Sequence, residues 1–350
     1  MNTQKIIAII LLILIVLLAI VAAVNHRAVR MVYGSLFAQK VPLDETANWA
    51  GGSSYEFLPY SDVSDADYLH LYVPESDAPM PLAIMVHGGG FILGDADSRQ
   101  AQYIYRYFRD HGYAAASVNY RLAEEAPYPA AIEDVKAAVR FLRANALQYG
   151  YDPDRFVILG ESAGGYLATM AAVTSDDEFM SVPFIGEDAG NPVSAKVSAL
   201  IDFYGIMDFY MEDADWRADG LPRIVVSLAN SWMWGKTGKY NSWMDCWIEQ
   251  KVIQAASPED AAQEMKQYSP SAYIAKNFTE DSDFHAMILH GDADITVSRQ
   301  NSLRLYDTFR KAIGDGKVQL VMYPGYGHAA DLFFSEEHLN EIKAYLDSVL

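Results

Sequence analysis

A serine near the middle of the chain has the surroundings of a catalytic nucleophile. Ser162 is the central residue of the sequence GESAG at 160–164, which follows the apolar run Phe156–Leu159 and precedes the Ala-rich segment Gly165–Val173. A strand, a tight turn and a helix in this order form the context in which G-x-S-x-G lifts a reactive serine off a sheet. Glycines flank the serine because side chains there would collide. We therefore predict an accessible Ser162 hydroxyl beside a helix N-terminus, whose free N–H groups favour negative charge.

A serine hydroxyl is a poor nucleophile unless a base lies within hydrogen-bond reach. Of the eight histidines, His328 lies on a Gly-flanked loop after the last predicted strand, at the sheet edge where Ser162 is also expected. Ligands collect at this carboxyl edge in open α/β sheets. We interpret His328 as the base. His290, at a strand end, is interpreted as structural and is the alternative base, while His87 is expected to hold its own loop by hydrogen bonds.

The base in turn needs a carboxylate that fixes its tautomer and stabilises the imidazolium ion. Asp292 and Asp294 both follow the strand predicted at 284–289, and a loop there would lie beside the loop of His328. Asp294 is preferred because the residues before it let the turn curl back toward the final loop. Asp292 would more readily bond its own turn, and it remains the alternative acid.

Three consecutive glycines follow another predicted strand. The continuous apolar run Leu82–Val86 is typical of a strand buried on both faces, and the sequence HGGGF at 87–91 comes directly after it. Glycines leave their N–H groups unshielded and adopt backbone conformations closed to other residues. Such a loop can donate hydrogen bonds to a developing oxyanion. The alternative is an ordinary flexible connection between a strand and a helix.

The rest of the chain alternates between the two periodicities of secondary structure. Further strands are predicted at 55–58, 68–73, 113–120, 197–204 and 318–323, helices at 101–111, 132–142, 305–313 and 339–349, and a turn at 150–154. Gly314 is expected to end the third of these helices and Ser335 to cap the last. Alternating strands and helices predict a mostly parallel sheet covered by helices on both faces, which is an α/β fold.

The segment 208–267 interrupts this alternation with an unusual number of large apolar side chains. It contains Trp216, Trp232, Trp234, Trp243, Trp247, Met211, Met233, Met244 and Met265. We interpret it as a cap inserted over the mouth of the site, with an apolar pocket for an acyl or aryl group. The alternative is an extra helical layer whose aromatic side chains only pack on the body.

The first residues contain a long apolar run. Residues 6–24 carry no charged or polar side chain, and a helix of this length would span roughly 28 Å, close to the hydrocarbon thickness of a bilayer. We interpret the run as an uncleaved, single-pass membrane anchor within residues 1–30. The alternative is a signal peptide cleaved near Ala23, although the run is longer than the usual h-region.

Charge and composition exclude other function classes. Residues 41–350 hold 22 basic and 46 acidic residues, a net charge of −24, which repels nucleic acid and anionic lipid surfaces. The single cysteine, Cys246, excludes an intramolecular disulfide. Histidine and cysteine do not occur at the spacing of a structural zinc site. No metal or other cofactor is expected, and the oligomeric state cannot be read from the sequence.

Several motifs together identify a family resemblance. They are HGGGF at 87–91, YRL at 120–122, YPAAIEDVKAAVRFLR at 128–143, GESAGG at 160–165, HGDAD at 290–294 and GH at 327–328. The chain resembles α/β-hydrolases of the hormone-sensitive-lipase-like carboxylesterase group over about 80–350. The order of Ser162, Asp294 and His328 is that of α/β-hydrolases. The resemblance implies these residues as nucleophile, acid and base.

The same resemblance implies three oxyanion donors and a function. The donors are the backbone N–H groups of Gly89, Gly90 and Ala163. The expected function is hydrolysis of small or medium acyl or aryl esters through an acyl-enzyme, without a cofactor. An amidase, arylformamidase or peptidase on the same fold, a lipase at a lipid interface, and a non-catalytic binding protein are the alternatives. A connector with the first strands is expected at 31–79, before a catalytic domain at 80–350 with the cap at about 208–267.

Overall fold

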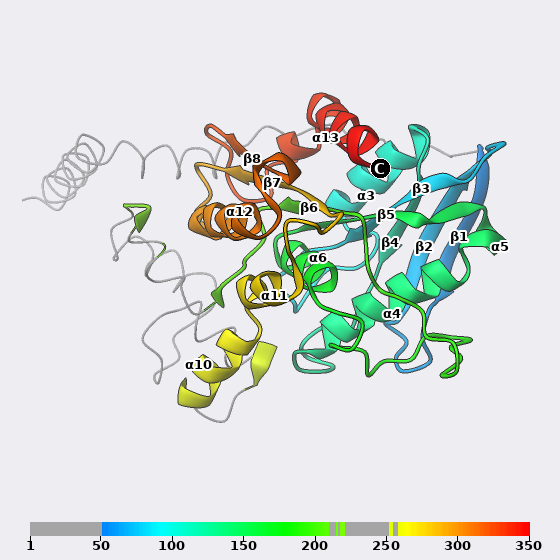
Figure 1. Ribbon diagram of the computed structural model, residues 1–350, viewed down its shortest axis with the longest axis horizontal. Helices are drawn as coiled ribbons and strands as arrows, with labels where there is room; N and C mark the ends of the chain where they lie inside the picture. Colours follow the sequence, from blue (N-terminus) through cyan, green and yellow to red (C-terminus); the bar gives the residue numbers. More distant parts are fainter. Residues whose placement is uncertain (1–50, 210–214, 216–217, 221–251, 255–257) are drawn as a thin grey trace, which may run out of the picture.

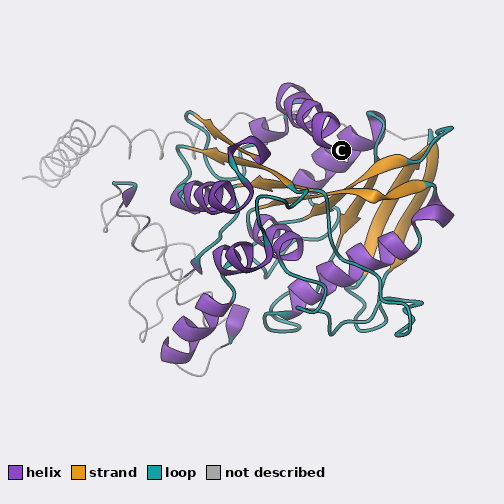
Figure 2. Cartoon of the chain, in the orientation of Figure 1, coloured by secondary structure: helices purple, strands orange, loops and turns teal. Residues whose placement is uncertain are grey.

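One eight-stranded sheet passes through the described part of the molecule, with helices on both of its faces (Figures 1 and 2). The computed structural model describes residues 51–209, 215, 218–220, 252–254 and 258–350. The strands are β1 (Gly52–Pro59), β2 (Tyr68–Pro74), β3 (Met80–Val86), β4 (Ala114–Val118), β5 (Tyr151–Glu161), β6 (Ala199–Phe203), β7 (His285–Gly291) and β8 (Val318–Tyr323).

The helices lie between these strands in the sequence. They are α3 (Arg99–Asp110), α4 (Ala130–Ala144), α5 (Ala146–Tyr149), α6 (Ala163–Val173), α10 (Pro258–Gln267), α11 (Pro270–Asn277), α12 (Gln300–Ile313) and α13 (Glu336–Val349), with 3₁₀ turns η3 (Asp315–Lys317) and η4 (Asp331–Phe334). As predicted, α12 ends at Gly314, which has a φ of 92°, and the Ser335 side chain caps α13 by accepting a hydrogen bond from the N–H of His338.

The strand order β1-β2-β4-β3-β5-β6-β7-β8 confirms the mostly parallel sheet. The strands β4, β3, β5, β6, β7 and β8 pair in parallel in this order. The strands β1 and β2, which belong to the segment 31–79, are added antiparallel at the β4 edge. The carboxyl ends of β3, β5, β7 and β8 therefore meet at one edge of the sheet. The glycine loop, Ser162, Asp294 and His328 each follow one of these ends.

The continuous apolar strands serve two cores, one on each face of the sheet. In β3, Leu82, Ile84 and Val86 belong to one core and Ala83 and Met85 to the other. Helices α4, α6, α11 and α12 cover the first face, and α3 and α13 cover the second (Figure 1). Burial on both faces is the reason that these strands lack polar alternation.

The segment 150–154 differs from its prediction. The turn expected at 150–154 is confined to Gly150, which has a φ of 95° and ends α5, and β5 already begins at Tyr151. Tyr151 pairs with Met80 of β3, and its buried hydroxyl donates to the carbonyl oxygen of Leu142 at 2.8 Å. The Asp and Pro residues at 152–154 suggested a turn, but pairing with β3 and burial of the Tyr151 ring extend the strand instead.

Two predictions fall mainly outside the described residues. Residues 6–24 are not described, and among the residues that are, no helix is long and apolar enough to cross a bilayer. The five tryptophans of segment 208–267 also lie outside the described ranges. Met265 of that segment is described, and it is buried in the core of the first face.

Candidate active site

Ser162 occupies the sharp turn between β5 and α6 that its motif predicted. Its φ of 54° is unusual for a residue with a side chain, and its N–H donates to the carbonyl oxygen of Phe203 at 2.9 Å. A Cβ at Gly160 would lie 2.1 Å from the carbonyl oxygen of Gly164, and a Cβ at Gly164 would lie 2.2 Å from that of Val86. The neighbouring backbone therefore requires glycine at both positions, and the turn holds Ser162 at the carboxyl edge of the sheet.

A chain of two hydrogen bonds joins Ser162, His328 and Asp294. Ser162 Oγ lies 2.9 Å from His328 Nε2, and His328 Nδ1 lies 2.7 Å from Asp294 Oδ2. An ionised carboxylate only accepts hydrogen bonds, so Nδ1 carries the proton and Nε2 is left to accept the proton of the Ser162 hydroxyl. The structure thus brings these three residues together, although Ser162 and His328 are 166 positions apart in the sequence.

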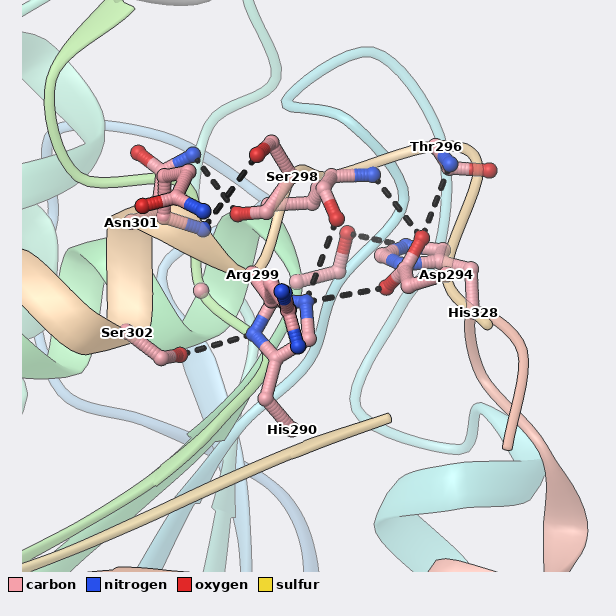
Figure 3. A network of polar contacts seen from close by, with 12 residues as sticks. His290, Asp294, Thr296, Ser298, Arg299, Asn301, Ser302 and His328 are labelled. Carbon is pink, nitrogen blue, oxygen red and sulfur yellow. Dashed lines mark hydrogen bonds and ion pairs between the residues drawn. The ribbon is translucent and has the colours of Figure 1, made fainter. Parts of the chain in front are cut away.

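Asp294 is held by its own loop as well as by His328 (Figure 3). Its Oδ1 accepts the N–H groups of Thr296 at 2.8 Å and Val297 at 2.9 Å. The loop residues therefore fix the direction in which Oδ2 meets the imidazole ring. These two amide contacts cannot be predicted from residue types, because nearly any residue could supply the N–H groups.

His290 has the structural role predicted for it. Its ring is fully buried, with Nδ1 2.7 Å from Ser302 Oγ and Nε2 3.1 Å from the carbonyl oxygen of Val297 (Figure 3). Nε2 also lies 3.4 Å from Asp294 Oδ2. His290 thus contacts the same carboxylate oxygen as His328 and is held by residues of the Asp294 loop and α12.

The charges of His328 and Asp294 stabilise one another. Burial of the ring lowers the pKa of His328, but the Asp294 carboxylate more than offsets this and raises it above 6.5. Burial would raise the pKa of Asp294, yet the charge of His328 and the contacts of both histidine rings hold that pKa well below its usual range. The pair therefore keeps Asp294 ionised and stabilises the imidazolium ion that forms when His328 accepts a proton.

His328 Nδ1 meets Asp294 rather than Asp292, the alternative acid, which contacts the final loop at another residue. Asp292 Oδ1 accepts the N–H of Gly325 at 2.6 Å, three residues before His328. Asp294, rather than Asp292, is the carboxylate that accepts the N–H groups of Thr296 and Val297 in the loop after β7. The loop after β7 and the loop after β8 thus lie side by side, and each of the two carboxylates contacts a different residue of the second loop.

The glycine loop lies against the same edge. Gly89 and Gly90 have positive φ values of 109° and 59°, and the carbonyl oxygen of Gly89 accepts the N–H groups of Ile92 and Leu93. As predicted, His87 holds this loop: its Nδ1 lies 2.7 Å from the carbonyl oxygen of Gly88. Burial lowers the pKa of His87 to about 4, so its ring is neutral at pH 7.

A pocket of about 360 Å³ opens above Ser162 and His328. Gly89, Gly90 and Ala163, the residues of the three expected oxyanion donors, line it, and Ile206 and Val297 are among its apolar walls. A tetrahedral oxyanion formed at Ser162 would thus lie in a cavity lined by the residues that carry the expected N–H donors.

The arrangement is suited to acyl transfer by nucleophilic attack. A hydroxyl, a ring nitrogen that accepts its proton and a buried carboxylate behind the ring form the usual machinery of a serine hydrolase. Among the described residues, no cluster of three or more His, Cys, Asp or Glu side chains could hold a metal ion. The sequence reasoning missed Glu161, which lines the pocket and contacts the glycine loop.

Comparison with known proteins identifies the family. The model of the family BD-FAE matches residues 69–309, which include the glycine loop, Ser162 and Asp294. The chain belongs to the BD-FAE family. This is a family of hormone-sensitive-lipase-like esterases, as the motifs implied. His328 lies beyond the matched residues, and its position in the site comes from the fold.

Similar proteins support this BD-FAE assignment. Esterase LipI of Mycobacterium tuberculosis is 41% identical over 104 residues, covering 29% of this chain and 31% of LipI. Esterase LipQ of the same organism is 26% identical over 278 residues, covering 79% of this chain and 57% of LipQ. The matched stretches thus span a third to little more than half of these relatives.

A solved structure shares the fold of this BD-FAE chain. It is a truncated carbohydrate esterase from gut microbiota, with a TM-score of 0.64, 24% sequence identity, and coverage of 88% of this chain and 99% of that one. At this identity the match establishes the α/β-hydrolase architecture of the sheet and its helices.

Proposed function

We propose that this protein is a serine hydrolase that cleaves carboxylic esters through an acyl-enzyme. The observation that carries the proposal is the continuous chain from Ser162 Oγ through His328 to Asp294, at 2.9 and 2.7 Å, beside a pocket lined by the glycine loop. Membership of an esterase family and the names of the relatives support the same reaction. The apolar walls favour an apolar acyl or aryl group.

In the proposed mechanism, Ser162 Oγ forms a bond to the ester carbonyl carbon while His328 Nε2 takes its proton. The carbonyl oxygen becomes an oxyanion that accepts hydrogen bonds from the N–H groups of Gly89, Gly90 and Ala163. Its collapse breaks the bond to the alcohol, which leaves with the proton from His328. Water then repeats these steps on the acyl-enzyme, so that the acid is released and Ser162 is restored.

Replacement of the proposed nucleophile tests this function. We expect Ser162→Ala to lower kcat for p-nitrophenyl acetate on the order of 10⁶-fold, the size of the loss in another serine hydrolase, and to abolish labelling by a fluorophosphonate. Ser198→Ala is the matched control, because Ser198 lies just before β6, at the end opposite the site, and its hydroxyl donates to the carbonyl oxygen of Asp154. Labelling that persists in Ser162→Ala would contradict the proposal.

The leaving group distinguishes an esterase from an amidase on the same fold. A series of p-nitrophenyl esters with acyl chains of two to twelve carbons is compared with the matching p-nitroanilides. We expect ester turnover with a preference for the shorter chains, since a cavity of about 360 Å³ limits the acyl group. Faster cleavage of the anilides would assign an amidase instead.

A further inference from the structure

Glu161 is a buried carboxylate that the proposed mechanism does not use. It is the last residue of β5, directly before Ser162, and only 5% of it is exposed. It lines the same pocket as Ser162 and His328. Burying a carboxylate is costly unless it accepts hydrogen bonds, so its contacts indicate what it does.

The main contact of Glu161 is with the glycine loop, 73 residues earlier in the chain. Glu161 Oε1 accepts the N–H of Gly88 at 2.6 Å, the short distance of a hydrogen bond to an ionised acceptor. A Cβ at Gly88 would lie 2.3 Å from the same oxygen, so this close approach requires glycine. The carboxylate thus connects the turn that carries the nucleophile with the loop that carries the expected oxyanion donors.

The Gly88 residue is held at both of its polar groups. Glu161 accepts from its N–H, and the His87 ring nitrogen Nδ1 lies 2.7 Å from its carbonyl oxygen. The His87 ring in turn stacks on Tyr120, with ring centroids 4.3 Å apart, and the Tyr120 hydroxyl donates to the carbonyl oxygen of His87 at 2.9 Å. These contacts leave the peptide planes of Gly88 little freedom.

The loop needs such external contacts because glycine does not restrict its own backbone. The two residues after Gly88 have φ values of 109° and 59°, which are two of the many conformations open to glycine. Contacts from outside the loop must therefore select them. Donors raise the rate of acyl transfer only if they already point at the oxyanion. A displacement of about 1 Å can cost about 10²-fold in rate.

We propose that Glu161 is a positioning residue that, by accepting the N–H of Gly88, aims the N–H groups of Gly89 and Gly90 at the oxyanion formed on Ser162. The inference rests on the proposed function, because it concerns the transition state of that reaction. Glu161 itself exchanges no proton with the substrate.

The charged and polar groups around Glu161 fit this role. Burial raises the pKa of Glu161, while the charge of His328 and the N–H of Gly88 favour the ionised carboxylate. Tyr204 packs edge-on against the His328 ring, with centroids 4.9 Å apart, and burial together with the charge of Glu161 raises the pKa of its hydroxyl. A neutral side chain with an acceptor oxygen could replace the hydrogen bond but not the charge.

Two substitutions at Glu161 separate these contributions. Glu161→Ala removes the acceptor, and we expect kcat for p-nitrophenyl acetate to fall about 10²-fold while KM stays within about twofold. Glu161→Gln keeps an acceptor oxygen, so kcat should stay within about tenfold of wild type. The matched control is Glu178→Gln, which changes a carboxylate that accepts the N–H of Ser175 far from the pocket, and its kinetic constants should be unchanged.

A second readout reports on the oxyanion itself. A trifluoromethyl ketone adds to the serine oxygen, its carbonyl oxygen becomes an oxyanion and the serine proton passes to the histidine. We expect Glu161→Ala to weaken this inhibitor by the same factor as kcat/KM, while fluorophosphonate titration counts intact sites. If Glu161→Ala only unfolded part of the protein and did not displace the N–H groups of Gly89 and Gly90, the number of titratable active sites would fall. The inhibitor affinity of each remaining site would be unchanged.

A substitution on the loop side tests the contact independently and serves if Glu161→Ala does not fold. Gly88→Ala places a Cβ against the carboxylate, and we expect a similar loss in kcat and in inhibitor affinity. The double variant with Glu161→Ala should lose no more than the worse single variant, because both remove one interaction.

The results separate failure of this inference from failure of the proposed function. Wild-type kcat and inhibitor affinity in Glu161→Ala, or an equal loss in Glu161→Ala and Glu161→Gln, would overturn the positioning role while Ser162→Ala remains inactive. Turnover or labelling that persists in Ser162→Ala would instead overturn the proposed function, whatever the Glu161 variants do.

Discussion

His328 is the residue whose protonation sets the pH dependence of the proposed reaction. As a base it must be neutral, and Asp294 raises its pKa above 6.5. The fraction of active enzyme therefore falls as the pH decreases through the His328 pKa. The same carboxylate that orients the ring thus moves the acidic limb of the activity profile to higher pH.

We predict that kcat/KM for p-nitrophenyl acetate falls as the pH is lowered, with the midpoint of the fall above pH 6.5. Asp294→Asn should shift this midpoint to lower pH, because the charge that raises the His328 pKa is gone, and should lower kcat about 10⁴-fold through the wrong tautomer. Turnover of p-nitrophenyl acetate measures the loss in kcat, and its pH profile, checked by the rate of fluorophosphonate labelling against pH, measures the midpoint. Asp307→Asn, a change of the same charge at an exposed position of α12, is the control. An unchanged midpoint in Asp294→Asn would contradict the assignment.

At the level of secondary structure, α12 connects the loop of Asp294 with the segment that follows β6. Asn301, buried in the first turn of α12, accepts the N–H groups of Met207 at 2.9 Å and Asp208 at 3.2 Å, and its amide donates to the carbonyl oxygen of Ser298 at 3.0 Å. Figure 3 shows Asn301 next to Ser298, beyond the contacts of Asp294.

Ion pairs strengthen the same connection. Arg304 of α12 pairs with Asp208 and with Asp215, the latter at 2.7 Å, and Arg299 pairs with Asp219 at 3.1 Å. These carboxylates belong to the first part of segment 208–267, the predicted cap. The beginning of that segment is thus attached to the helix that directly follows the loop of Asp294.

We predict that Asn301→Ala lowers the free energy of unfolding by about 1–3 kcal/mol, because it leaves two buried backbone N–H groups without their side-chain acceptor. Urea denaturation followed by tryptophan fluorescence measures the change. Asn191→Ala, at an exposed loop position, should stay within about 0.5 kcal/mol of wild type. A similarly small change for Asn301→Ala would show that the connection contributes little.

At the level of the whole molecule, the acidic body predicts repulsion from anionic membranes, whereas the apolar run near the start of the sequence predicts attachment to a membrane. The net charge of −24 over residues 41–350 opposes binding to anionic lipid, whereas residues 6–24 are apolar throughout. The membrane anchor stays a prediction, since those residues lie outside the described ranges, and it concerns attachment of the chain rather than its reaction.

We predict that the full chain remains in the membrane pellet after alkaline carbonate extraction. Leu14→Arg, at the centre of the run, should move a substantial fraction to the supernatant, because a central Arg costs about 2.5–3.5 kcal/mol on insertion. Lys40→Arg, which keeps the charge outside the run, is the control. A mature N-terminus near residue 24, found by mass spectrometry, would support the cleaved signal instead.

Much of this molecule follows from local patterns. Apolar runs predicted the central strands, Gly314 and Ser335 marked helix ends, and the rule that parallel strands present their carboxyl ends at one edge brought Ser162, Asp294 and His328 together. These inferences work because strand burial, helix capping and the turn around a nucleophile depend on residues close in sequence.

Other features depended on contacts that no local pattern contains. Tyr151 extends β5 because it pairs with Met80, and Asp292 reaches Gly325 because two loops happen to lie side by side. Glu161 occupies a variable position of the G-x-S-x-G motif, and only the fold shows that its carboxylate accepts the N–H of Gly88.

The order and chemical types of the reactive groups, and the sheet that would carry them, are thus written in the amino-acid sequence. Which carboxylate meets His328, and which buried acid holds the glycine loop, was decided only on folding. The physical reason is that a hydrogen bond requires two groups within about 3 Å, and for groups 34 or 73 residues apart that separation is set by strand register and loop packing.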